Sequence, residues 1–318
     1  MKCRMSDATA AAAATAVPEP EVGDSTFQCS PALHRQPGET CIPKAALEKM
    51  RRTWNKLHPA EKIGTAAAGE GGLWKGIRSA MKRHYQCTTE YCVIEKMPGI
   101  DKKERASMRS YFKPAKPDAW TKKPTAWLDS FNIEDVMNQY EAAYPHFEFI
   151  GPVPIDFDAP DGNWGRCIVD ELCKLDVRKA AAAGTTMIGI IFNLDAHDEP
   201  GSHWVCAFID IAKSSAYYFD SYAVEPPKEV QVLLKRLHDQ GIAHIYYNDV
   251  RHQRKGSECG MYCLYTIISL IGGRSFYNVC KHIIDDDTMN TLRDIIFATE
   301  KPRKPALEKA LGLLPPAS

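Results

Sequence analysis

Residues 203–220 read HWVCAFIDIAKSSAYYFD, and this stretch decides the fold of the chain. Two apolar runs, His203–Ile211 and Tyr217–Asp220, are rich in the β-branched and aromatic residues that favour strands, and the Lys-Ser-Ser segment between them is typical of a turn. The stretch therefore predicts a hairpin that begins at His203 and ends at Asp220. In such a hairpin both polar side chains reach the same end of the sheet.

The sequence around this hairpin predicts more strands and several helices. We expect strands at Thr185–Leu194 and Ala243–Asp249, an extended segment at Phe149–Phe157, and helices at Ile133–Tyr144, Arg166–Leu175, Pro227–Gln240, Glu258–Ile271 and Thr288–Phe297. Clustered strands flanked by helices are typical of an α+β domain.

The N-terminal part of the chain differs from the rest in amino-acid composition and charge. Residues 1–40 include the Ala/Thr run Ala8–Ala16 and are expected to form a disordered tail. Ile42–Lys123 holds 19 Lys and Arg against 8 Asp and Glu, a net charge of +11, although the whole chain carries 40 of each sign. With helices predicted at Ala45–Leu57 and Leu73–Tyr85, we expect a basic helical N-terminal domain over residues 41–115. Its charge is interpreted either as a solvated surface or as a contact for anions or nucleic acid. Residues 116–318 form the α+β domain.

Composition excludes some classes of protein. Hydrophobic residues make up 44% and charged residues 25% of the 318, so the chain is neither wholly disordered nor fibrous. The longest apolar stretch, Cys263–Gly273, is too short to span a bilayer, and no membrane anchor is predicted. Without a convincing signal peptide, the 11 cysteines are expected to be thiols in a reducing, intracellular setting. A zinc site is a weak alternative for the irregularly spaced cysteines at positions 29, 41, 87 and 92, and no metal site is predicted.

Residues that suit thiol chemistry converge on Cys259, which follows Gly256, Ser257 and Glu258 at the start of a predicted helix. The positive end of a helix favours the thiolate, and a neighbouring imidazolium favours it further. His203 is the candidate base and Asp220 the carboxylate that orients it. Gln253 and the backbone N–H of Cys259 are candidate donors for an oxyanion.

Three other residues are weighed against these. Cys263 lies one helical turn after Cys259 and is interpreted as buried core. His197, in a polar loop, and His252, next to Gln253, are secondary candidates for the base.

The order and spacing of these residues resemble the adenovirus-endopeptidase and SUMO-protease (Ulp-type) superfamily of cysteine peptidases. That pattern has His-Trp, an Asp ending a strand 17 positions later, and a Gln six positions before Cys-Gly, as His203-Trp204, Asp220, Gln253 and Cys259-Gly260 do here. The resemblance implies a central mixed sheet flanked by helices. It also implies that His203 is the general base, Asp220 its partner, Cys259 the nucleophile and Gln253 the oxyanion donor.

The resemblance also implies a narrow substrate channel. Trp127-Leu128, ahead of the first catalytic-domain helix, corresponds to a Trp-Leu segment of the family. Trp127 and Trp204 would then cover a channel that admits only Gly-Gly, because two indole rings leave no room for other side chains. Gly260 permits a close approach of the backbone at this place. The alternative for Trp127 is ordinary core packing.

A closer resemblance is to proteases of large double-stranded DNA viruses, such as the African swine fever virus polyprotein protease, on the residues 54–59 (WNKLHP), 124–140 and 151–157 (GPVPIDF). It implies an endopeptidase with an N-terminal arm domain that cleaves capsid or core precursors after Gly-Gly or Gly-X-Gly without a cofactor, in the host cytoplasm and virion. An alternative is a deconjugase of SUMO-like or ubiquitin-like proteins. A third is a DNA-binding virion protein without catalysis, and DNA is a candidate activator of the enzyme.

Overall fold

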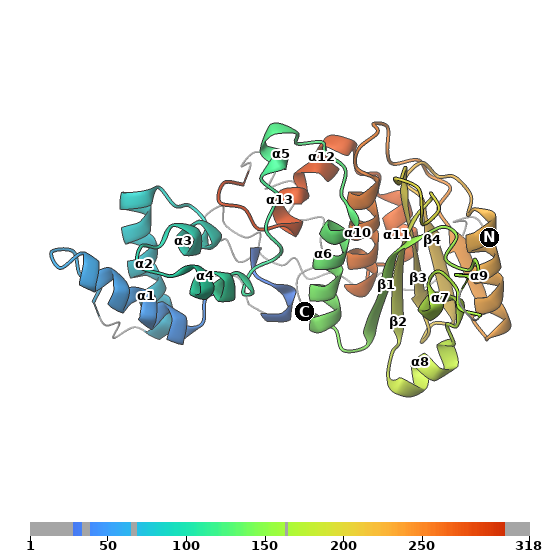
Figure 1. The fold of residues 1–318 in the computed structure, drawn as a ribbon, viewed down its shortest axis with the longest axis horizontal. Coiled ribbons are helices and arrows are strands. Elements are labelled where there is room, and N and C mark those ends of the chain that lie inside the picture. Colours follow the sequence, from blue (N-terminus) through green and yellow to red (C-terminus); the bar gives the residue numbers. More distant parts are fainter. Residues whose placement is uncertain (1–27, 34–38, 65–68, 163–164, 303–318) are drawn as a thin grey trace.

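The chain folds into a helical region at one end and a sheet with covering helices at the other (Figure 1). The computed structural model describes residues 28–33, 39–64, 69–162 and 165–302. The Ala/Thr run lies outside the described residues. Part of the predicted tail is ordered: residues 31–33 form a short 3-10 helix, η2 (Pro31–Leu33), and Cys29 is buried.

In the described part of the chain, five strands form one sheet in chain order: β1 (Phe147–Pro154), β2 (Met187–Asn193), β3 (Trp204–Asp210), β4 (Ser215–Phe219) and β5 (His244–Tyr247). The outer pairs β1–β2 and β4–β5 are parallel, whereas β2–β3 and β3–β4 are antiparallel. The predicted mixed sheet of an α+β fold is therefore confirmed.

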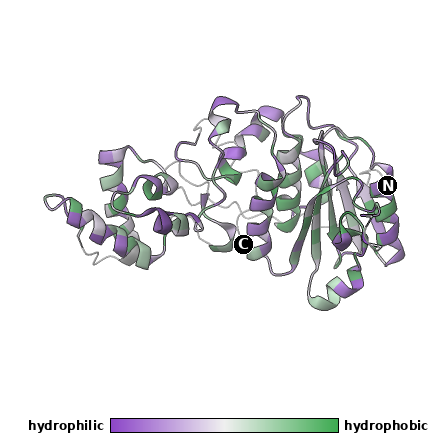
Figure 2. Ribbon diagram, viewed as in Figure 1, coloured by the Kyte–Doolittle hydropathy of each residue, from purple (hydrophilic) through white to green (hydrophobic). Residues whose placement is uncertain are grey.

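Helices cover both faces of this sheet. Alternate residues of a strand point to opposite sides, so the apolar side chains of each face need helices to pack against. Ile188, Ile190 and Phe192 of β2 pack with α7 (Asp170–Cys173), α8 (Val177–Ala183) and α9 (Lys228–Asp239). Ile191 and Phe208 lie on the other face, in a core shared with α6 (Ser130–Ala143), α10 (Cys259–Ile271), α11 (Phe276–Lys281), α12 (Asp286–Thr291) and α13 (Arg293–Ile296). Figure 2 shows hydrophobic residues along the strands and α10.

Helix α10 is the innermost helix, and all of its residues are buried. An apolar sequence on every side of a helix favours such a position. Gly189 of β2 lets α10 lie close to the sheet: a Cβ there would be 3.0 Å from the Phe147 ring and 3.2 Å from the Ile267 side chain. The first residue of α10 is Cys259, so this packing fixes the position of the candidate nucleophile.

The N-terminal region has a hydrophobic core of its own, formed by α1 (Lys44–Leu57), α2 (Gly69–Tyr85), α3 (Glu90–Lys96) and α4 (Lys102–Arg109). The chain then passes through α5 (Ala119–Lys122), whose Trp120 belongs to the core around α10. The end of the described chain lies between the two regions: Ala298 exchanges backbone hydrogen bonds with Pro114 and Lys116, both 2.8 Å long.

Some predicted elements differ from the structure. The helix predicted at Thr288–Phe297 is two short helices, α12 and α13, which meet at Leu292. The one predicted at Arg166–Leu175 is reduced to α7. Helices α3, α4, α5, α8 and α11 were not predicted; each has eight residues or fewer, too few for a periodic pattern to stand out.

The prediction of free thiols is wrong for six cysteines. Disulfides join Cys29 to Cys41, Cys87 to Cys92 and Cys167 to Cys173, with Cα atoms 5.2, 5.4 and 6.4 Å apart, distances that a disulfide spans. The zinc alternative for the first two pairs is excluded in this state, because bonded sulfurs are not thiolate ligands. The folded backbone brings these pairs together, which irregular sequence spacing did not reveal.

No helix within the described residues is long and apolar enough to cross a membrane.

Candidate active site

The predicted hairpin places His203 and Asp220 side by side. His203 immediately precedes β3 and Asp220 immediately follows β4, and the antiparallel register of these strands brings both residues to one end of the sheet. Nε2 of His203 lies 2.8 Å from Oδ1 of Asp220, whose side chain is almost fully buried. The structure thus provides the oriented imidazole that the sequence predicted.

Asn248, just after β5, holds Asp220 in place and was missed by sequence reasoning. The Asp220 N–H donates to Oδ1 of Asn248, and Nδ2 of Asn248 donates back to the Asp220 carbonyl, both at 2.9 Å. The Tyr222 N–H donates to Oδ1 of Asp220 at 2.8 Å. A buried Asn at the end of a strand gave no signal in the sequence, because its partner lies 28 positions away.

His203 is favoured in its protonated form. Burial lowers its pKa, but the hydrogen bond that the imidazole donates to Asp220 and a further one with the Cys259 thiol together outweigh burial and raise the pKa to about 9. Because Nε2 of His203 is hydrogen-bonded to Asp220, the other ring nitrogen, Nδ1, is the one available to the Cys259 thiol. The imidazole also stacks on the Tyr222 ring, with 4.9 Å between centroids, and Arg251 lies 5.0 Å from that ring.

Cys259 is buried at the N-terminus of the 13-residue helix α10. The unpaired N–H groups of such a terminus favour a negative charge on the thiol and on an oxyanion beside it. The structure therefore brings together the three residues Cys259, His203 and Asp220 from α10 and the two ends of a hairpin.

Gln253 lies buried in the loop between β5 and α10. Its Oε1 accepts a hydrogen bond from the Ser221 hydroxyl at 2.6 Å, and its Nε2 donates to the Lys255 carbonyl at 2.6 Å. The amide nitrogen carries a second hydrogen, which is the donor that the predicted oxyanion role needs. Ser221, next to Asp220, was not predicted and fixes which way the amide points.

The two tryptophans have different environments. Trp127 is 51% exposed, and its Nε1 donates to the Gly256 carbonyl at 2.8 Å, so the packing alternative for this residue is excluded. Trp204 is 7% exposed, and its Nε1 donates to the Leu128 carbonyl at 3.0 Å. Gly260 touches this second indole: a Cβ at Gly260 would lie 3.3 Å from Cδ1 of Trp204. The close approach predicted for Gly260 is thus to Trp204 and Leu128.

The secondary candidates lie elsewhere. His197 is exposed and paired with Asp156, 2.6 Å away. His252 is buried with Nε2 at 3.1 Å from the Cys280 carbonyl, and burial lowers its pKa. Cys263 is buried, which raises the pKa of its thiol well above the usual value. As predicted, Cys263 belongs to the core.

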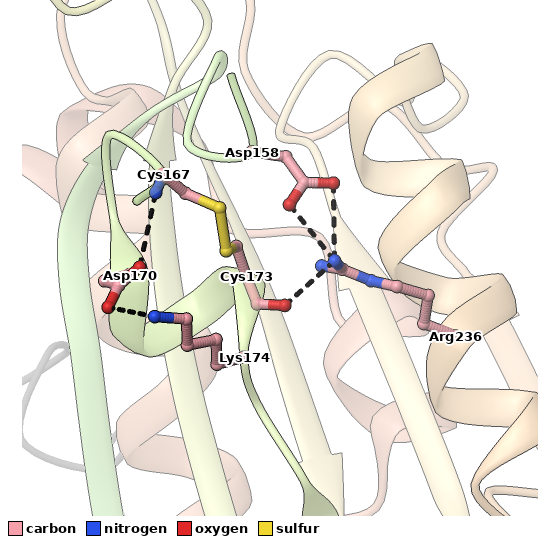
Figure 3. Close-up of a disulfide and its surroundings, with 6 residues drawn as sticks. All are labelled: Asp158, Cys167, Asp170, Cys173, Lys174 and Arg236. Carbon is pink, nitrogen blue, oxygen red and sulfur yellow. Dashed lines mark hydrogen bonds and ion pairs between the residues drawn. A yellow bond between two sulfur atoms is a disulfide. The ribbon is translucent and has the colours of Figure 1, made fainter. Parts of the chain in front are cut away.

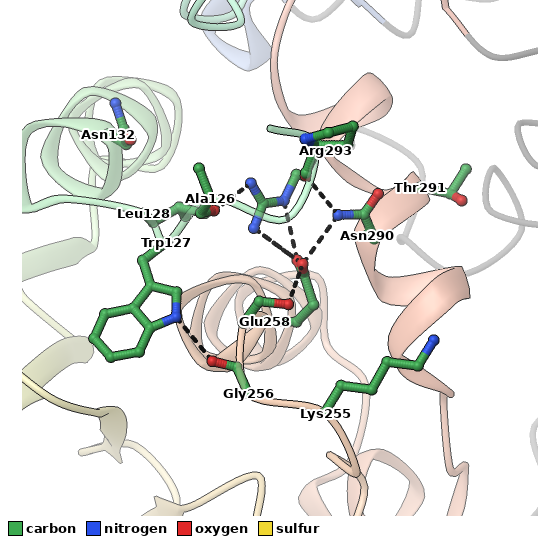
Figure 4. A network of polar contacts seen from close by, with 12 residues as sticks. Ala126, Trp127, Leu128, Asn132, Lys255, Gly256, Glu258, Asn290, Thr291 and Arg293 are labelled. Atoms are coloured by element: carbon green, nitrogen blue, oxygen red, sulfur yellow. Dashed lines mark hydrogen bonds and ion pairs between the residues drawn. The ribbon is translucent and has the colours of Figure 1, made fainter. Parts of the chain in front are cut away.

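A buried ionic network directly before Cys259 was also missed (Figure 4). Arg293 of α13 pairs with Glu258, with Nη2 2.9 Å from Oε2, and both side chains are almost fully buried. Asn290 of α12 donates to the same carboxylate at 2.9 Å. Glu258 adjoins the candidate nucleophile and could have drawn notice, but nothing in the sequence pointed to Arg293.

Among the described residues, one group has the geometry of metal ligands: Asp158, Cys167 and Cys173. In this structure the two sulfurs form a disulfide, and Arg236 donates to Asp158 at 3.1 Å and to the Cys173 carbonyl at 3.1 Å (Figure 3). The Arg236 guanidinium already pairs with the Asp158 carboxylate, and both sulfurs are bonded to each other and are not thiolates. These residues therefore do not fit a metal ion.

The site has the arrangement of a cysteine peptidase, with a thiol at the start of a helix beside an imidazole that is bonded to a carboxylate. Residues 176–304 match the model of the Ulp1 protease family, C-terminal catalytic domain.

Comparison with known proteins points to viral relatives. The chain is similar to a protein of Acanthamoeba polyphaga mimivirus that is assigned as a thiol protease, with 34% identity over 192 residues, 57% of this chain and 61% of that protein. It is also similar to a cysteine protease of African swine fever virus, with 25% identity over 232 residues, 66% of this chain and 83% of the relative. The chain therefore spans about three fifths of the length of the mimivirus relative.

The crystal structure of the African swine fever virus protease has the same fold. It aligns with a TM-score of 0.58 at 20% identity and covers 86% of this chain and 96% of that one. A coverage of 86% is more than residues 116–318 alone, so part of the region before residue 116 aligns as well as the sheet.

Proposed function

We propose that this protein is an endopeptidase that cleaves after Gly-Gly or Gly-X-Gly in viral capsid or core precursors, in the host cytoplasm and virion. The observation that carries the proposal is the arrangement of Cys259 at the start of α10 beside an imidazole that is bonded to Asp220.

The reaction uses these groups in two steps. The Cys259 thiolate attacks the scissile carbonyl carbon and forms a C–S bond, and the oxygen takes the negative charge next to the Cys259 N–H and the Gln253 amide. His203 gives its proton to the leaving amine as the C–N bond breaks. Water, deprotonated by His203, then attacks the thioester, which releases the carboxylate product and the thiolate.

The surroundings of the thiol support the selection of glycine. The Trp127 indole is half-exposed but tied to the Gly256 carbonyl, and Leu128 and Trp204 pack directly on Gly260 beside the nucleophile. A substrate chain that runs between these rings and α10 meets apolar walls on both sides. Glycine is the residue that such walls exclude least.

The test compares wild type with Cys259→Ala on a short Gly-Gly-X peptide, read by mass spectrometry. Cleavage after the second glycine by wild type alone supports the proposal. A matched substrate with Ala in place of the second glycine should be cleaved poorly. Cleavage that persists in Cys259→Ala, or no cleavage of the glycine peptide at all, contradicts it.

A deconjugase of SUMO-like proteins is the second candidate. It is favoured by the relative from another African swine fever virus isolate, which is named a SUMO-1 cysteine protease and is 25% identical over 232 residues. The same active site serves both reactions, but a deconjugase needs a docking surface for a folded modifier. Cleavage of a SUMO-like fusion at least about tenfold faster than of a peptide with the same Gly-Gly-X site would favour this candidate.

Contact with DNA through the N-terminal region is proposed as an added property. The support is the net charge of +11 over residues 42–123 together with exposed side chains at Lys56, Lys75 and Lys82. Binding to duplex DNA should weaken steeply between low and physiological salt if phosphates are the ligand. If DNA neither binds nor changes the rate of peptide cleavage, this proposal and the DNA-binding alternative are both discarded.

A further inference from the structure

The carboxylate of Glu258 does not cap the helix that follows it. Glu258 stands at the N-cap position of α10, yet its side chain accepts no hydrogen bond from the backbone of that helix. Oε2 accepts instead from Nε of Arg293 at 3.0 Å, and Oε1 accepts from Nη2 of Arg293 at 3.1 Å. The exposed fractions of the two side chains are 1% and 0%.

A buried ion pair of this kind is not an efficient way to stabilise a fold. The two charges lose their hydration, and an apolar pair of the same size is often as stable or more so. What the pair supplies is geometry, because the planar guanidinium fixes the direction of each partner. The other partners of Arg293 therefore indicate what is being positioned.

Those other partners lie in the segment that carries Trp127. Nη1 of Arg293 donates to the Ala126 carbonyl at 2.7 Å, and Nδ2 of Asn290 donates to the Pro124 carbonyl at 2.9 Å. The same Nδ2 also donates to Oε1 of Glu258 at 2.9 Å. Both side chains thus join the segment before Trp127 to the residue before Cys259. Figure 4 shows the contacts of Arg293 with Ala126 and Glu258 and the contact of Asn290 with Glu258.

Trp127 joins the same two segments from the other side, through its hydrogen bond to the Gly256 carbonyl at 2.8 Å. Leu128, the next residue, contacts the position of Gly260: a Cβ there would lie 3.1 Å from the Leu128 Cβ. The wall formed by Trp127 and Leu128 is therefore attached to the first turn of α10 at several points. Two of these attachments are made by α12 and α13.

We propose that Arg293, assisted by Asn290, is a positioning residue that sets the distance between the Trp127–Leu128 wall and the Cys259 thiol and neutralises the carboxylate of Glu258, the residue before Cys259. The proposal deepens the proposed function and rests on it for the role of the wall. Arg293 touches no substrate and acts through Glu258 and Ala126.

Two consequences follow for chemistry. A misplacement of about 1 Å between the bound peptide and its nucleophile costs on the order of a hundredfold in rate. A buried carboxylate without its cation would oppose both the thiolate and the oxyanion, because like charges repel strongly where water is excluded. Loss of the guanidinium geometry should therefore lower the rate of peptide cleavage. Loss of its positive charge should separately disfavour the Cys259 thiolate.

The test uses the full chain and two readouts. The first is alkylation of Cys259 by iodoacetamide as a function of pH, which needs no substrate. The second is kcat and KM for the Gly-Gly-X peptide. The variants are Arg293→Lys, which keeps the charge but cannot span both partners, and the charge-free double variant Glu258→Gln with Arg293→Met. Arg293→Met alone leaves the carboxylate unpaired.

We expect Arg293→Lys to be alkylated at a pH near that of wild type but to lose about tenfold to a hundredfold in kcat/KM. Arg293→Met should need a higher pH than wild type for the same rate of alkylation, because the unpaired carboxylate opposes the negative charge of the thiolate. The double variant should recover the wild-type pH dependence but not the kcat/KM.

Lys116→Met is the matched control. Lys116 pairs with Asp294, the residue after Arg293 on the same helix α13, and not with Glu258. This variant should lower the melting temperature and leave alkylation, kcat and KM unchanged. If Arg293→Lys and the double variant behave like this control, Arg293 is merely structural and the proposal is wrong.

The two proposals fail in different ways. If wild type does not cleave the peptide, the proposed function fails, whereas alkylation still decides whether Arg293 controls the thiol. If Arg293→Met does not fold, Arg293→Lys and the double variant still give both readouts. Unchanged alkylation and unchanged kcat/KM in those two variants overturn the inference.

Discussion

Nε2 of His203 lies 2.8 Å from Oδ1 of Asp220 although 17 positions separate these residues in the chain. The strands β3 and β4 bring them together, since one residue precedes the first strand and the other follows the second. The carboxylate and the Cys259 thiol raise the pKa of His203 to about 9 against the opposing effect of burial.

Replacement of Asp220 by Asn should remove the main cause of that raised pKa. His203 must be protonated to release the amine, so wild-type kcat/KM should fall as pH rises through about 9. In Asp220→Asn the rate should drop by about a hundredfold or more, and the remaining activity should decline at a lower pH. A pH profile of peptide cleavage measures both. His197→Gln, which removes an exposed imidazole paired with Asp156, is the control and should keep the wild-type profile.

Stability should depend on pH through the same residue. A His whose pKa is higher in the folded state stabilises the fold fully below its unfolded pKa of about 6.5, and this contribution is lost as pH rises through about 9. Urea unfolding of wild type should therefore show a falling free energy of unfolding across that range. The fall should be smaller in Asp220→Asn. An equal slope in the two proteins would argue against the His203–Asp220 pair.

Of the two thiols of the first turns of α10, only Cys259 should react quickly. Burial raises the pKa of the Cys263 thiol, which also contacts Cys206, whereas Cys259 has an imidazolium beside it. Mass spectrometry after brief treatment with iodoacetamide should find the label on Cys259. Cys263→Ala should retain most activity, and Cys259→Ala should have none. Rapid labelling of Cys263 would contradict the assignment.

Gly260→Ala should damage both stability and activity. The added methyl group would lie 3.1 Å from the Leu128 Cβ and 3.3 Å from Cδ1 of Trp204, so these side chains must shift. Overpacking of this kind costs about 1–3 kcal/mol, and here it displaces the channel wall, which should raise KM. Thermal unfolding and peptide kinetics measure the two effects. Gly64→Ala, where nothing lies within 4 Å of the added Cβ, should show neither.

The three disulfides should be detectable by counting thiols. Protein purified without reductant and then unfolded should expose four of the ten cysteines in the described residues to a thiol reagent, because six of those ten are bonded. Serine at both Cys29 and Cys41 should raise neither this count nor the reactivity of Cys259, but it should lower the free energy of unfolding by about 2–4 kcal/mol. Eleven reactive thiols in the unreduced protein would contradict the three pairings.

The sequence by itself determined the order of the main elements and the chemistry of the site. Two apolar runs rich in β-branched and aromatic residues, separated by a turn, marked a hairpin in residues 203–220, and its length brought His203 and Asp220 to one end. The apolar run after Cys259 marked a buried helix, which α10 is. These features follow from the residue types in short runs of sequence, which are local properties of a chain.

Local patterns did not show which distant residues meet. Asn248 supports Asp220 from 28 positions away, and Arg293 reaches Glu258 from 35 positions away. Six cysteines were expected to be thiols because the compartment was inferred from the absence of a signal peptide. Their pairing depends on Cα separations that only the folded backbone fixes.

The sequence thus determined which residues could perform thiol chemistry and in which kind of element each lies. The tertiary structure alone decided how they are held: Ser221 directs Gln253, Leu128 and Trp204 pack on Gly260, and Arg293 anchors the residue before Cys259. The physical reason is that a hydrogen bond or ion pair requires atoms within about 3 Å in a given direction. Packing of α10 against the sheet, α12 and α13 sets those directions, and a local sequence pattern does not predict them.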